Sequence, residues 1–206
     1  MYAKIIIAYI MRKFIIIIVM LMLLLNIAVR VFRGEERTPQ SVFKEQIDVA
    51  PMQYYCNPTY GYNIAYPCFF HEDESEDGDS CHARFIFTYN TNIIVETYVM
   101  KAPCRSTRDC ALALTGNRDG NSAEALSGAG RPLSQLSDIS KNSFILSGRV
   151  YENGQPTDGY RHYTKYIKSG HILFVYSLIY PEDYKQALGR MFRTIDKWTV
   201  TGALVD

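Results

Sequence analysis

The residues best suited to chemistry in this 206-residue chain are few, and no catalytic signature joins them. There are only four histidines. The chain has no Gly-x-Ser-x-Gly nucleophile turn, no glycine-rich phosphate loop and no His-Glu-x-x-His zinc motif. These absences predict a protein that is not an enzyme and that needs no cofactor.

His162 is the histidine with the most suggestive surroundings. It alternates with Tyr160, Thr164 and Tyr166, so all four share one face of a predicted strand. An aromatic row with one titratable group could line a pocket, which makes Tyr160, His162 and Tyr166 candidate ligand-binding residues. The alternative is a cross-strand packing row without a ligand. A pocket around His162 would also suit a second hypothesis, a small hydrolase or another enzyme.

Three arginines around a predicted short helix form a second candidate ligand site. Arg105 and Arg108 lie at the start of that helix, and Arg118 follows its end. A deep pocket that contains this arginine cluster would favour ligand binding or catalysis. A flat apolar patch at the surface would instead indicate a protein partner.

The five cysteines all lie well beyond the N-terminus, where an oxidising compartment would let them pair. Cys68 and Cys81 stand at the two ends of an acidic insert. A disulfide between them would close a loop of about fourteen residues and stabilise the fold by about 3 kcal/mol. Cys104 and Cys110 are the second candidate pair, which leaves Cys56 over. Cys110 could instead be a small core residue on a helix.

The acidic insert between Cys68 and Cys81 fits neither of two metal sites. A calcium loop needs a bidentate glutamate at its twelfth position, which is Arg84 here. A zinc site would use two pairs of residues, Cys68 with His71 and Cys81 with His82. The members of the second pair are adjacent on a strand, so they point to opposite faces and cannot easily share a metal. We therefore expect no metal site, and a solvated loop closed by a disulfide.

An unbroken apolar run, Phe14 to Leu25, follows two basic residues near the N-terminus. This pattern is typical of a secretory signal peptide, with cleavage after Ala28. Extended to Val29, the run approaches the roughly 17 residues that span a bilayer, so an uncleaved membrane anchor stays open. We expect residues 1–29 to be a signal peptide or membrane anchor. The protein would then be exported to a bacterial periplasm, or held in the inner membrane facing it.

The rest of the chain alternates between strand-like and helix-like segments. Residues 30–54 are expected to be a linker with at most one short helix, which begins at Thr38-Pro39. Strands are predicted at 60–67, 83–89, 92–101, 143–152, 159–168 and 171–180, with helices at 106–115 and 181–198. A Gly-, Ser- and Asn-rich loop is predicted at 116–142.

The last three strands are joined by turns, at 154–159 and at Ser169-Gly170, which makes them antiparallel neighbours. Both alternating sets of side chains in 171–180 are apolar: Ile172, Phe174, Tyr176 and Leu178 on one side, and Leu173, Val175 and Ile179 on the other. Both faces of the sheet must therefore be covered.

The order of these elements carries a family resemblance. Its motifs are a Gly-Tyr-x-Ile-x-Tyr-Pro strand at 61–67, a helix led by Ser106, Asp158-Gly159-Tyr160 opening a strand, and Tyr180-Pro181-Glu182 entering the last helix. With these motifs the chain resembles the PsbP-like superfamily, which includes the photosystem II extrinsic subunit, a Ran-binding nuclear import factor and DcrB-type bacterial envelope proteins. The resemblance implies a PsbP-like globular domain at 55–201. Its fold would be α+β, a mainly antiparallel sheet covered by helices on both faces as an α/β/α sandwich.

Composition narrows the possible functions further. A net charge of +1 excludes a polybasic protein that binds nucleic-acid phosphates, and the length excludes a large modular enzyme. The resemblance implies binding rather than a common active site. We expect an exported envelope protein that acts as a non-catalytic module for an envelope protein or a small ligand. It would touch the membrane only through an uncleaved N-terminal segment. A structural accessory subunit of an envelope complex is the third hypothesis.

Overall fold

The structure, a computed structural model, describes residues 11, 13–26, 37–73, 82–89, 92–115, 134–152 and 155–200. The chain divides into two compact units, Met1–Thr38 and Pro39–Asp206. In the first unit, residues 11 and 13–26 are helical. Within the described ranges, no helix combines the length and the apolar character needed to cross a membrane.

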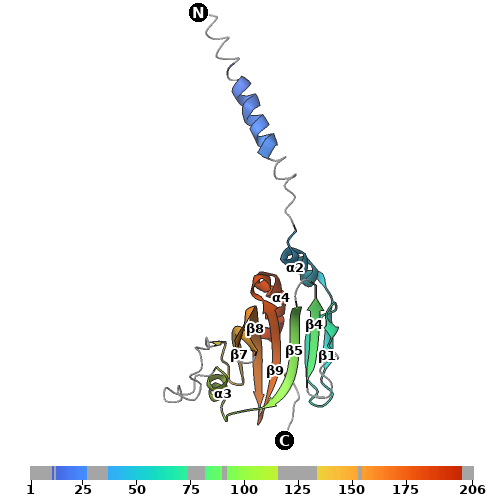
Figure 1. Cartoon of the computed structure of the whole chain (residues 1–206), viewed down its shortest axis with the longest axis vertical. Helices are drawn as coiled ribbons and strands as arrows, with labels where there is room; N and C mark the ends of the chain where they lie inside the picture. The colour runs from blue at the N-terminus through green and yellow to red at the C-terminus, as the bar shows by residue number, and fades with distance from the viewer. Residues whose placement is uncertain are drawn as a thin grey trace, which may run out of the picture. The chain divides into compact units, whose positions relative to one another are not determined.

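A seven-stranded antiparallel sheet dominates the second unit, in the order β3-β4-β5-β9-β8-β7-β6 (Figure 1). Its strands are β3 (His71–Glu72), β4 (Ala83–Thr88), β5 (Asn92–Lys101), β6 (Gln135–Ser137), β7 (Ser143–Glu152), β8 (Gln155–Ser169) and β9 (Ile172–Pro181). A separate antiparallel hairpin is formed by β1 (Met52–Cys56) and β2 (Asn63–Pro67). The helices are α2 (Pro39–Val49), α3 (Thr107–Leu114), the 3-10 helix η1 (Glu182–Leu188) and α4 (Gly189–Lys197). This confirms an α+β fold built on an antiparallel sheet.

Each face of the sheet has its own core, because the side chains of β9 alternate between two apolar clusters. Phe174, Tyr176 and Leu178 pack in the larger cluster with residues of α2, β2, η1 and α4. Leu173 lies in the smaller cluster, where it packs with Phe144 of β7 and with α3. Helices therefore cover both faces, and the predicted two-sided burial of this strand is confirmed.

Helix α2 belongs to the globular unit, so the predicted linker at 30–54 is too long. The helix begins at Pro39, as predicted, and buries Phe43 and Ile47. The guanidinium of Arg190 on α4 donates hydrogen bonds to the carbonyls of Ile47 (2.7 Å), Asp48 (3.1 Å) and Ala50 (2.7 Å). These are carbonyls that the end of a helix leaves without partners. Only two buried apolar residues mark this helix, which is too weak a pattern to assign it to the core.

Three other boundaries differ from the predictions. The first half of the predicted helix at 181–198 is the 3-10 helix η1, and the predicted loop at 116–142 contains the short strand β6. The predicted turn at 154–159 lies almost wholly inside β8, which begins at Gln155. Its turn-forming residues fit a strand because the β7–β8 register shifts between Arg149 and Tyr151, and because Gly159 adopts φ +75°.

The cysteines confirm one predicted pair. Cys104 and Cys110 form a disulfide across the start of α3, with their Cα atoms 5.2 Å apart. Cys110 is also completely buried, so it serves as a core residue as well. Cys56 and Cys68 are exposed and have no disulfide partner among the described residues. Because Cys81 and most of the acidic insert lie outside the described residues, the Cys68–Cys81 pairing stays a prediction.

Candidate functional site

A polar hollow lies where the β7–β8 hairpin meets η1. Its volume is about 340 Å³. It is lined by Gln135, Ser147, Gly148, Arg149, Arg161, His162, Tyr180, Glu182 and Lys185. A smaller hollow of about 120 Å³ shares Arg149, Arg161 and Glu182 with it and adds Tyr160 and Asp158. We call the larger one the cationic hollow, because three of its lining residues are basic and one is acidic.

The register of three strands places the cationic side chains. Arg149 of β7 is the Cα partner of Arg161 of β8, and Arg161 is in turn the partner of Tyr180 of β9. All three therefore share the sheet face that η1 and α4 cover. Arg149 and Arg161 are like charges directly opposite each other, an arrangement that destabilises a sheet. The register shift that follows Arg149 is a feature often found beside functional sites, where it redirects a side chain.

One carboxylate balances part of the positive charge. The guanidinium Nη2 of Arg161 donates a hydrogen bond to Oε1 of Glu182 over 2.7 Å. This bond lowers the pKa of Glu182, and the positive charges of Arg149 and Lys185 lower it further. Glu182 therefore stays ionised at neutral and mildly acidic pH. The hollow keeps an excess of positive charge.

The uncharged lining residues can orient a ligand. Gln135 and Ser147 are Cα partners at the β6 edge, and both carry polar side chains. Tyr180 is only 3% exposed, and this burial raises the pKa of its hydroxyl. The phenol therefore remains protonated and able to donate a hydrogen bond. Together these residues supply neutral polar groups around the charged centre.

His162 borders the cationic hollow, but its imidazole belongs to the other face of the sheet. Neighbours on a strand point in opposite directions, so the ring of His162 lies opposite the guanidinium of Arg161. Its Nδ1 is 3.2 Å from Oγ1 of Thr164, and its Nε2 is 3.4 Å from Oγ of Ser134. A Cβ on Gly148 would lie 3.2 Å from that Nε2, so only glycine leaves the ring ample room. Both of these ring nitrogens therefore contact hydroxyl groups of nearby side chains.

Acidification tests the burial of His162. Burial lowers the pKa of this imidazole below its ordinary value near 6.5. Between the two pKa values the unfolded chain binds more protons than the folded one, so stability is lost as the pH falls below about 6.5. We expect urea unfolding to show a smaller acid-induced loss for His162→Gln than for the unchanged chain. Equal acid-induced losses in His162→Gln and in the unchanged chain would contradict the prediction.

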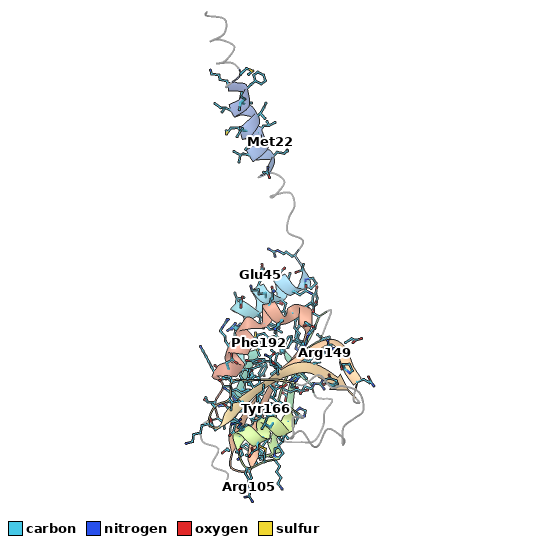
Figure 2. The ribbon with its side chains drawn as sticks, turned by 90° about the vertical axis from the view of Figure 1, so that its left-hand side faces the viewer. Met22, Glu45, Arg105, Arg149, Tyr166 and Phe192 are labelled. Carbon is cyan, nitrogen blue, oxygen red and sulfur yellow. A yellow bond between two sulfur atoms is a disulfide. The ribbon has the colours of Figure 1, made fainter. Side chains whose placement is uncertain are left out.

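The other predicted ligand residues are not brought together. Tyr160 lines the smaller hollow, whereas Tyr166 stacks on Phe144 within the smaller core. Arg105 and Arg108 lie at the start of α3; Figure 2 shows Arg105 at the bottom of the unit, well away from Arg149. Arg118 lies outside the described residues. Neither Arg105 nor Arg108 is among the residues that line the cationic hollow.

Sequence reasoning missed the residues that charge the hollow, namely Arg149, Arg161, Glu182 and Lys185. The predicted β7–β8 hairpin contained a usable signal. Two arginines on adjacent antiparallel strands become neighbours once the register is known. The predicted turn at 154–159 does not give the observed β7–β8 register, so it does not place Arg149 opposite Arg161.

Comparisons with known proteins establish the fold of this chain and nothing finer. No protein-family model and no curated protein matches the chain. Solved structures similar to the chain include the following three. Ran-binding protein Mog1p of Saccharomyces cerevisiae has 10% identity and a TM-score of 0.50, covering 72% of this chain and 94% of that one. Cyanobacterial PsbP (CyanoP) of Synechocystis sp. PCC 6803 has 14% identity and a TM-score of 0.47, covering 72% and 91%.

The third is LpqN of Mycobacterium tuberculosis, involved in cell envelope biogenesis, with 14% identity and a TM-score of 0.39 over 81% of this chain and 98% of that one. Identities this low concern architecture and not activity. The likeness to Mog1p covers 72% of this chain, and it confirms the predicted resemblance at the level of the fold. The chain has the Mog1p-like fold.

Proposed function

We propose that this chain is an exported envelope protein that acts as a non-catalytic binding module, and that it holds its ligand in the cationic hollow. The observation that carries the proposal is the lining itself, in which three basic side chains and one carboxylate surround about 340 Å³. Small-molecule sites begin at about this size and use a few convergent polar groups. An anionic ligand is therefore the class that fits.

Two features support export. The N-terminal apolar run has the pattern of a secretory signal, and the Cys104–Cys110 disulfide suits an oxidising compartment. Neither depends on the hollow, so export and ligand binding are separate parts of the proposal.

A hydrolase built around His162 is the second candidate, and one contact favours it. Oγ of Ser134 lies 3.4 Å from Nε2 of His162, an arrangement in which the imidazole could take the hydroxyl proton. The group on Nδ1 is the hydroxyl of Thr164, whereas catalytic triads place a carboxylate there to stabilise the imidazolium. A binding module explains the charged lining of the cationic hollow, whereas the Ser134–His162 pair does not.

Thermal unfolding of the full chain in mild detergent tests the binding proposal. We expect succinate or sulfate, compared with chloride at equal ionic strength, to raise Tm by about 5–10 °C at one hundred times Kd. The double variant Arg149→Gln/Lys185→Gln should lose this response. Arg108→Gln, which removes a positive charge on α3, should retain it. The proposal fails if no anion raises Tm, or if the double variant responds like the unchanged chain.

A further inference from the structure

Two positive charges in the cationic hollow have no counter-charge among the residues that the structure describes. Arg161 is neutralised by Glu182, with 2.7 Å between Nη2 and Oε1. In the described part of the chain, neither Arg149 nor Lys185 has an ion-pair partner. Among the described residues, Glu182 is the only carboxylate that lines the cationic hollow. The lining therefore carries a net charge of +2.

These two charges converge on the same small volume. Arg149 lies directly across the strands from Arg161, whose guanidinium holds Glu182. Lys185 stands three residues beyond Glu182 on η1 and lines the same hollow. Both cations act on the carboxylate of Glu182 strongly enough to lower its pKa. One compact group in the hollow can therefore interact with both cations.

The charge count separates the classes of anion. A monocarboxylate would leave one cation uncompensated, whereas a compact dianion would match both. A phosphate monoester is such a dianion above about pH 6, and its three terminal oxygens accept paired hydrogen bonds from a guanidinium. Tyr180 and Gln135 offer neutral groups for further oxygens or for the esterified part of the ligand.

We propose that the cationic hollow is a site for a phosphate monoester dianion, held by Arg149 and Lys185 while Arg161 stays paired with Glu182. This inference rests on the proposed function, and it names the ligand's charged group. The phosphate belongs either to a soluble small molecule or to the headgroup of a lipid such as phosphatidic acid. Both present the same chemistry to the hollow.

Calorimetric titration of the full chain in mild detergent tests this proposal with methyl phosphate, sulfate and acetate as probes. We expect methyl phosphate and sulfate to bind at least tenfold more tightly than acetate at about pH 7.5. From there to about pH 5, methyl phosphate becomes mostly monoanionic, so its affinity should fall about tenfold, whereas sulfate stays a dianion and keeps its affinity. Glu182 and Tyr180 keep their charge states over this range. The sulfate titration also serves as the control for protonation of His162, whose ring faces away from the arginines, because the charge of sulfate does not change over this range.

Three variants locate the site. Arg149→Gln and Lys185→Gln should each weaken binding of methyl phosphate by tenfold or more, because each removes a charge-assisted hydrogen bond. Glu182→Gln should tighten it several-fold, because it removes the one repelling carboxylate and releases Arg161. Arg108→Gln serves as the matched control and should bind like the unchanged chain. The Tm of each variant, measured without anion, shows that it is folded.

Vesicles separate the two sources of the phosphate. If the headgroup is the ligand, vesicles of phosphatidylcholine with phosphatidic acid should bind the unchanged chain more tightly than they bind the Arg149→Gln/Lys185→Gln variant. This difference in affinity between the two proteins should be larger than the difference measured with vesicles of phosphatidylcholine alone. Binding of methyl phosphate with no such difference identifies a soluble ligand. If acetate and succinate bind as well as phosphate, the phosphate assignment is wrong although the proposed function stands. If no anion binds, both fail.

Discussion

Replacing Lys165 by alanine is expected to lower the free energy of unfolding by about 3 kcal/mol. Lys165 lies on β8 with only 6% of its surface exposed. Its Nζ donates hydrogen bonds to the backbone carbonyls of Asp196 (2.5 Å) and Trp198 (2.8 Å) at the end of α4. Without the amine these carbonyls lose their donor in a place that water reaches poorly. Urea unfolding followed by circular dichroism measures the loss.

Two further variants separate the causes of this loss. Lys168→Ala removes the next lysine along β8, whose amine bonds only to the carbonyl of Gly170 near the exposed turn, and it should cost less than about 0.5 kcal/mol. Lys165→Met keeps most of the hydrocarbon stem and removes the donors. If Lys165→Met proves as stable as the unchanged chain, the capping of α4 does not depend on the amine.

Trp198→Ala is expected to cost about 4 kcal/mol, the largest effect of any single change considered. The indole is 7% exposed and packs against Tyr62 and Tyr176, with ring centroids 6.1 Å and 5.4 Å away. Its Nε1 donates a hydrogen bond of 2.8 Å to the carbonyl of Asn63 on β2. One side chain therefore joins the end of α4 to β2 and β9.

The conservative variant divides this cost into its parts. Trp198→Phe keeps an aromatic ring and loses the N–H, so it should cost about 1 kcal/mol for the hydrogen bond and a similar amount for the smaller ring. Trp198 is the only tryptophan in the chain, so thermal unfolding is followed by circular dichroism rather than by fluorescence. A loss below about 1 kcal/mol for Trp198→Ala would show that the indole is not part of the core.

The sequence predicts the fold best where burial imposes a pattern. The strand at 143–152 has the predicted bounds, and the apolar alternation of residues 172–179 predicted two covered faces. Strand β1 has no predictive sequence pattern, because it is a surface strand whose side chains are largely exposed. Helix α2 is recognised mainly through its contacts with Arg190 and with the core, which the local sequence does not contain.

The candidate site is harder to predict because it depends on pairing rather than on spacing. His162 was singled out for its strand neighbours, and its ring lies on the face away from the arginines. Arg149 and Arg161 become neighbours only through the β7–β8 register, which the shift after Arg149 and the left-handed Gly159 determine. Lys185 and Glu182 enter through η1, whose 3-10 geometry the apolar pattern did not distinguish from an α-helix.

The central place of β9 has a consequence for the order of folding. This strand is the last along the described chain, yet it separates β5 from β8 in the middle of the sheet. The sheet cannot close around its centre until residues 172–181 are available, because no earlier strand takes that position. Such late, long-range pairing slows folding. A chain emerging from the ribosome therefore stays without its complete sheet until β9 has emerged. If the chain is exported as proposed, this delay favours the threading of an unfolded chain.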